Sequence, residues 1–94
     1  MDIDGKVTIP KQVMARRVGE EVVLLDLVTG TYFGLDPVGS RVWELLDAGQ
    51  TLAQVLNTVL DEYEVSPETL KLDIQALMQE LLARGLVAIE TALK

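Results

Sequence analysis

The 94 residues of this chain suit one small domain, because a chain of this length buries only about 60 to 65% of its unfolded surface and has little left for a second core. Cysteine and histidine are both absent, which excludes disulfides, thiolate nucleophiles, the usual general base and the commonest metal ligands. The net charge of −7 disfavours nucleic acid as a partner, since its phosphates would repel such a chain.

The sequence indicates neither a membrane span nor a secretion signal. No apolar run approaches the roughly 18 to 20 residues that cross a bilayer. The amino-terminal segment MDIDGKV contains two acids where a signal peptide has basic residues. We therefore expect a cytoplasmic protein.

The first third of the chain predicts short strands. Two β-branched segments, Val7–Ile9 and Val13–Val18, are separated by Pro10, and the second is the better strand. Val22–Val28 is the strongest strand in the chain. A turn at Thr29-Gly30 leads into a further strand, Thr31–Leu35. The last two strands therefore form a hairpin.

The two faces of Val22–Val28 differ in polarity. One face, which contains Val23, is apolar throughout, whereas Asp26 interrupts the other. We expect the Val23 face to cover the core, with Phe33 and Leu35 packed on the same side.

Gly34 is unusual inside a strand. A glycine there marks either a bulge or a place where another backbone or a ligand comes close. Both alternatives fit this position.

Helix start and stop signals divide the rest of the chain into three helices. Asp36 precedes a first-turn proline, Thr51 and Gln54 fit a capping box, and Ser66 precedes another proline. Apolar residues then recur at helical spacing in each segment. The predicted helices cover 37–47, 52 to about 63, and 67 to Arg84-Gly85.

Three strands followed by three helices predict an α+β domain, in which a three-stranded antiparallel sheet precedes a helical triplet. This content resembles a small winged helix, although DNA-binding winged helices usually place helices before the wing. Residues 86–89 form either a short final strand or a cover for the core.

No catalytic constellation is present in the sequence. Asp61, Glu62 and Glu64 cluster beside a turn, which is typical of a solvated face and not of a metal site. The glycine spacing fits neither a dinucleotide fingerprint nor a phosphate loop. We expect no enzyme activity, no cofactor and no metal.

The remaining candidate for function is a surface. If Thr31–Leu35 is an edge strand, its unpaired amides and carbonyls can receive an extended peptide, and the third helix can form the opposite wall. Alternatively, the amino-terminal segment or the carboxyl-terminal tail covers this edge. We expect Leu77 to belong mainly to the core and Met78 to reach the groove. The candidate peptide-binding residues are Thr31, Tyr32, Phe33, Gly34, Leu35, Leu70, Asp73, Ile74, Leu77 and Met78.

Three blocks of the chain are similar in order and spacing to the PqqD-like proteins, the peptide-recognition domains of pathways that modify ribosomally made peptides. These blocks are LLDLVTGTYFGLDPVG, the WELL that follows it, and LDIQALMQELLARGLV; the resemblance covers about 13–89. It implies a domain that binds the leader of a precursor peptide as an added strand along the third strand, in a groove closed by the third helix. The domain would then present the precursor to a modifying enzyme such as a radical enzyme, a peptidase or an ATP-dependent cyclase.

One segment departs from the members of this family that serve pyrroloquinoline quinone synthesis. Those members typically have a Pro-Glu-containing segment after the Leu-Leu pair of the second strand, whereas this chain has Asp26–Gly30 there. The run Gly30–Pro37 is closer to stand-alone domains of lasso-peptide and other modified-peptide clusters. Two further hypotheses remain, a winged-helix regulator that binds nucleic acid and a structural or oligomerising adaptor that uses the same edge.

Overall fold

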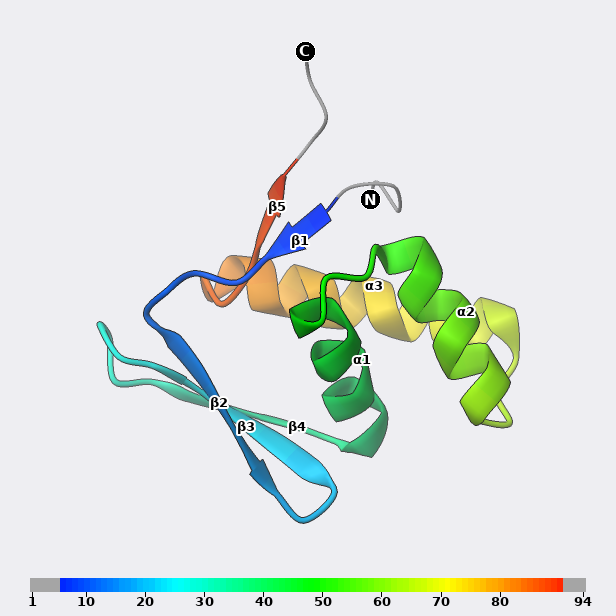
Figure 1. Cartoon of the computed structure of the whole chain (residues 1–94), viewed down its shortest axis with the longest axis horizontal. Coiled ribbons are helices and arrows are strands. Elements are labelled where there is room, and N and C mark those ends of the chain that lie inside the picture. Colours follow the sequence, from blue (N-terminus) through cyan, green and yellow to red (C-terminus); the bar gives the residue numbers. More distant parts are fainter. Residues whose placement is uncertain (1–5, 91–94) are drawn as a thin grey trace.

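A computed structural model describes residues 6–90 of the chain and contains two small sheets and three helices (Figure 1). β2, β3 and β4 form an antiparallel sheet in that order, whereas β1 and β5 pair as a separate sheet. The predicted α+β domain, with a three-stranded antiparallel sheet followed by three helices, is confirmed, and the two-stranded sheet is an addition. The elements are β1 (Lys6–Thr8), β2 (Val13–Val18), β3 (Glu21–Asp26), β4 (Tyr32–Leu35), α1 (Pro37–Asp47), α2 (Leu52–Glu62), α3 (Pro67–Ala83) and β5 (Ala88–Glu90).

Strand β3 buries the face opposite to the predicted one. Val22, Leu24 and Asp26 are buried, whereas Leu27 is 56% exposed. The prediction that the face containing Val23 covers the core is therefore wrong.

The side chains of β4 follow the buried face of β3. Directly paired residues of two strands share a face, and Leu24 pairs with Phe33 while Val22 pairs with Leu35. Phe33 and Leu35 therefore point toward the helices. The prediction that they lie on the side of Val23 is wrong for the same reason.

The burial of Asp26 has a local cause. Its Oδ1 accepts hydrogen bonds from the amides of Val28 at 2.9 Å and Thr29 at 3.2 Å, and its carbonyl accepts from the amide of Gly30 at 2.7 Å. A buried acid is tolerated when its oxygens are hydrogen-bonded in this way. The turn therefore begins at Leu27, and β3 ends at Asp26 instead of Val28.

Each helix begins directly after its predicted capping residue. The side chains of Asp36, Thr51 and Ser66 accept hydrogen bonds from first-turn amides of α1, α2 and α3, which would otherwise lack a partner within the helix. In α2 the side chain of Gln54 accepts in return from the amide of Thr51 at 2.9 Å. The predicted capping box and the predicted helix starts are confirmed.

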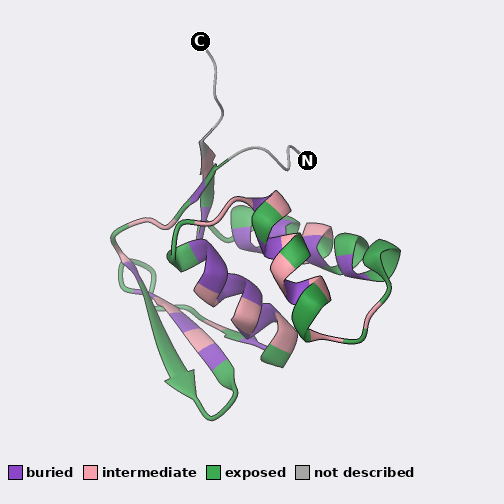
Figure 2. Cartoon of the chain, turned by 45° about the vertical axis from the view of Figure 1, so that its right-hand side comes forward, coloured by how far each residue is buried: buried purple, intermediate pink, exposed green. Residues whose placement is uncertain are grey.

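The inward faces of the helices meet the sheet in one hydrophobic core (Figure 2). In α3 the buried residues are Leu70, Ile74, Met78 and Leu81, whereas Leu77 is only half-buried. At 3.6 residues per turn the four buried positions form one stripe, and position 77 lies beside it. The prediction that Leu77 is core and Met78 reaches a groove is therefore wrong.

The two ends of the described chain pair with each other. Val7 of β1 lies opposite Ile89 of β5, and Leu86 and Val87, just before β5, are buried. Both alternatives for this last segment, a strand and a cover for the core, are thus realised. The described parts of the two ends leave the free edge of β4 uncovered.

Two predictions about localisation concern different parts of the chain. The acids that argue against a secretion signal lie at positions 2 and 4, outside the described residues. None of the helices within residues 6–90 is long and apolar enough to cross a membrane.

Candidate functional site

Strand β4 is an edge of the three-stranded sheet, and the direction of its amides follows from the pairing with β3. The amide of Asp26 donates to the carbonyl of Thr31 at 3.0 Å, so Thr31 and, two residues later, Phe33 exchange hydrogen bonds with β3. Because backbone groups alternate in direction along a strand, those of Tyr32 and Gly34 point away from the sheet. Among residues 6–90 no strand pairs with this side of β4.

Gly34 lies at the centre of the free edge. It pairs regularly with Val23, so the alternative of a bulge is wrong. A Cβ added at Gly34 would meet no atom within 4 Å among the neighbours that the structure describes. The face of the sheet that a side chain at position 34 would enter is therefore open.

A cavity of about 670 Å³ opens between β4 and α3. Its β4 side consists of Phe33, Gly34 and Leu35, and its α3 side includes Leu70, Asp73, Ile74 and Leu77. Its floor comes from the first turns of α1 (Val38, Gly39, Val42), and one end comes from the α2–α3 connection (Tyr63, Glu64, Val65). The lining is mainly apolar, which is typical of a site that holds side chains of a bound molecule.

The structure brings most of the predicted site residues together. Thr31 and Tyr32 belong to the same strand region but do not line the cavity. Met78 is fully buried in the core and cannot contact a bound molecule unless the core opens. Its half-buried neighbour Leu77 has the position that was expected of Met78.

The α2–α3 connection forms a wall of the site that the sequence pattern did not predict. Tyr63 and Val65 lie there, half-buried, in a segment between two helices. Position 63 is the predicted end of the second helix, whereas the structure ends α2 at Glu62. A β-branched residue in a short polar connection was the available signal, because such a position usually faces solvent.

A buried serine joins β4 to α1. The hydroxyl of Ser40, on the first turn of α1, accepts from the amide of Val22 at 2.7 Å and donates to the carbonyl of Leu35 at 3.2 Å. It thereby bridges the last pair of the β3–β4 ladder. The bridge fixes the end of the free edge relative to the helix that forms the floor of the cavity.

The other end of β4 contacts the end of α3. The guanidinium of Arg84 lies 4.8 Å from the centroid of the Phe33 ring, within the range of a cation–π interaction. The same guanidinium donates to a carboxylate oxygen of Glu80 at 2.6 Å. This arrangement ties α3 to the strand near the turn at Gly30.

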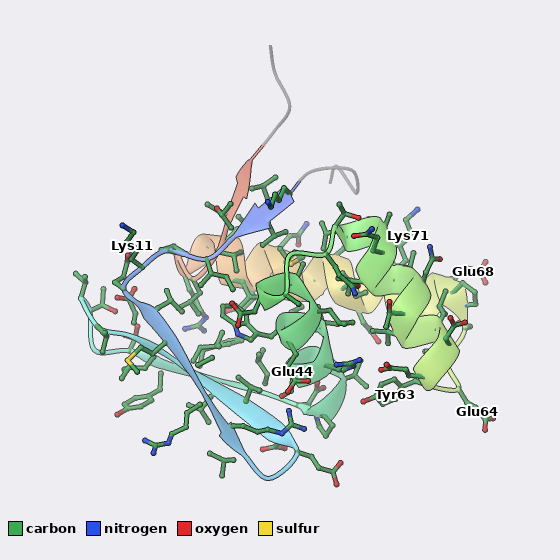
Figure 3. The ribbon with its side chains drawn as sticks, in the orientation of Figure 1. Lys11, Glu44, Tyr63, Glu64, Glu68 and Lys71 are labelled. Carbon is green, nitrogen blue, oxygen red and sulfur yellow. The ribbon has the colours of Figure 1, made fainter. Side chains whose placement is uncertain are left out.

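In the acidic cluster at the end of α2, Glu62 is paired with an arginine. Glu62 accepts two hydrogen bonds of 2.8 Å from the guanidinium of Arg41 on α1, and this bonding lowers the pKa of Glu62 below its ordinary value. Within the described part of the chain no three acidic side chains converge on a point that could hold a metal ion. Glu64, in contrast, extends outward from the α2–α3 connection, on the opposite side from the side chain of Tyr63 (Figure 3).

The chain matches one protein family and two solved structures. The family model for PqqD, described as coenzyme PQQ synthesis protein D, matches residues 21–87. TbiB1, solved in complex with the TbiA(beta) leader peptide, is 37% identical, with 93% of this chain and 99% of that chain covered and a TM-score of 0.80. Lasso peptide synthetase B1, solved in complex with the leader peptide, is 25% identical, with 88% of this chain and 98% of that chain covered and a TM-score of 0.80.

No curated protein matches the chain. The family match begins with β3 and ends just before β5, so it contains the free edge, all three helices and the cavity between β4 and α3. Because it spans well over half of the sequence, the chain belongs to the PqqD family.

Proposed function

We propose that this protein binds the leader of a ribosomally made precursor peptide as a strand added to β4, and presents the precursor to a modifying enzyme. The observation that supports this most strongly is the free edge of β4, with the backbone groups of Tyr32 and Gly34 directed outward, beside an apolar cavity closed by α3. The two similar structures contain leader peptides. The protein itself performs no chemistry and needs no cofactor or metal.

The free edge and the cavity serve different parts of recognition. Hydrogen bonds to the backbone of Tyr32 and Gly34 hold any extended segment, so they contribute affinity without selecting a sequence. The cavity beside Phe33 and Leu77 accepts side chains that alternate along the added strand and therefore contributes selectivity. A short strand with one or two filled pockets binds with a Kd of roughly 1 μM or tighter.

The pathway that best fits is the synthesis of a lasso peptide or another modified peptide. One of the similar structures is a lasso peptide synthetase B1, and the hydrogen-bonded turn after Asp26 occupies the place of the Pro-Glu-containing segment found in members that serve pyrroloquinoline quinone synthesis. The modifying enzyme would be a peptidase, a radical enzyme or an ATP-dependent cyclase. Both partners would be met in the cytoplasm, where precursors are made.

Selection from a displayed library of random 16-residue peptides, with the TbiA(beta) leader included as a reference sequence, tests this function. We expect enriched peptides that bind the purified protein, keep their mass after incubation with it, and lose binding when Gly34 is replaced by proline. Enrichment only of peptides that bind the Gly34→Pro protein equally well would contradict the proposal.

A further inference from the structure

The cavity between β4 and α3 is unequally charged along its length. Its lining contains three acids, Asp36, Glu64 and Asp73, and no lysine or arginine. Asp36 directly follows β4, and Glu64 follows the end of α2, which the Arg41–Glu62 ion pair holds against the first half of α1. These two acids therefore lie at the end of the groove near Leu35. Arg84 lies at the opposite end, over Phe33.

Two of these acids have no partner within the described chain. Asp36 is occupied as the cap of α1, where its Oδ1 accepts from the amide of Gly39 at 2.7 Å. Glu64 and Asp73 take part in none of the ion pairs or side-chain hydrogen bonds found among residues 6–90. Both residues line the cavity and both side chains are exposed, so no partner within residues 6–90 neutralises their charge at the mouth of the groove.

Three basic residues, Arg41, Lys71 and Arg84, do not neutralise Glu64 and Asp73, because each is paired with another acid or lies outside the cavity lining. Arg41 is held by Glu62, and Arg84 is held by Glu80. Lys71 is on α3 but does not line the cavity. The charge at this end of the groove is therefore left for a ligand to balance.

On the basis of the proposed function, we infer that the leader recognised by this chain has a lysine or arginine beside Glu64 and Asp73, and an apolar side chain in the cavity near Phe33. Antiparallel pairing is the commoner and slightly more stable arrangement. In that direction the part of the leader opposite Leu35 comes first, so the basic residue precedes the apolar one. Since both side chains face α3, an even number of positions, two or four, separates them.

The library selection described above tests this charge pattern on the full chain. We expect a lysine or arginine two or four positions before an apolar residue in most enriched peptides that depend on Gly34. We also expect the double variant Glu64→Gln/Asp73→Asn to bind these peptides about three- to tenfold more weakly, because two exposed ion pairs are lost. Raising the salt concentration should reduce the difference, because exposed charges are screened.

A matched control separates the local effect from the change in net charge. Glu20→Gln/Glu68→Gln also removes two negative charges, but from exposed positions outside the cavity lining; Glu68 lies in the first turn of α3 (Figure 3). This control should bind as the parent does. Replacing the basic residue of an enriched peptide with alanine should weaken binding to the parent but not to Glu64→Gln/Asp73→Asn, since the two changes remove the same interaction.

The outcomes distinguish this inference from the function on which it rests. Enriched peptides that need Gly34 but show no preference for a basic residue, or that bind both double variants alike, would overturn the charge pattern and leave leader recognition standing. Absence of any peptide that depends on Gly34 would overturn both.

Discussion

At the free edge of β4 the direction of each amide determines the effect of a substitution. The amide of Gly34 points away from the sheet, so Gly34→Pro should leave the fold intact, since proline is tolerated where an edge amide faces solvent. It should weaken peptide binding at least about tenfold, because it removes a donor and alters the backbone beside the added strand. Thermal unfolding and a binding titration on the same sample check both expectations.

Two further variants control for this result. Phe33→Pro removes an amide that faces β3, so the carbonyl of Leu24 loses its donor. This loss alone should destabilise the fold by about 1 to 3 kcal/mol. Gly34→Val keeps the amide and adds bulk in open space, so it should fold as the parent does. If Gly34→Pro binds peptide as tightly as the parent, the added strand does not lie along β4.

Alanine substitutions at the neighbouring residues Leu77 and Met78 should have different effects on stability and on peptide binding. Met78 is fully buried, so Met78→Ala should cost about 2 to 5 kcal/mol of unfolding free energy. Leu77 is half-buried at the cavity, so Leu77→Ala should cost less stability and weaken peptide binding several-fold. Denaturant melts paired with titrations test this division, and equal stability losses with unchanged affinity for Leu77→Ala would contradict it.

Two cases show why the sequence could predict the fold and the site only in part. Helical spacing places both Leu77 and Met78 near the apolar stripe of α3, and only the packed position of the helix determines which of them reaches solvent. Likewise Asp26 suggests an exposed face until its bonds to Val28 and Thr29 are known. In both cases tertiary placement, which periodicity does not contain, decided the outcome.

At the scale of elements, the junction between β4 and α1 depends on one hydroxyl. Ser40→Ala would leave the buried amide of Val22 and the carbonyl of Leu35 without their bridge. We expect a loss of about 1 to 3 kcal/mol in the free energy of unfolding. Because the same bridge holds β4 against the floor of the cavity, peptide affinity should also fall. A denaturation curve that is unchanged in Ser40→Ala would show that the bridge contributes nothing.

Elements defined by local chemistry were predictable, whereas distant pairings were not. The caps at Asp36, Thr51 and Ser66 fixed the helix starts because a side chain and an amide three residues apart suffice. The pairing of β1 with β5 joins opposite ends of the described chain and has no local signal. The α2–α3 connection became a wall of the site for the same reason, since only packing brings it to β4.

At the scale of the whole molecule, charge and element order distinguish this protein from DNA-binding winged helices. With a net charge of −7, we expect no measurable affinity for a 20-base-pair DNA duplex even at low salt, where phosphate attraction is strongest. Fluorescence anisotropy of labelled DNA in about 50 mM salt tests this. A salt-sensitive rise in anisotropy would favour the regulator hypothesis instead.

The most direct test of strand addition is amide hydrogen exchange, measured by NMR with and without a selected peptide. We predict that the amides of Tyr32 and Gly34 become at least about tenfold more protected on binding, because each gains a strand partner. The outward amides of Ala15 and Arg17, on the opposite edge formed by β2, should keep their exchange rates and provide an internal control. A bound peptide that leaves Tyr32 and Gly34 unprotected, or that protects the β2 edge instead, would contradict strand addition along β4.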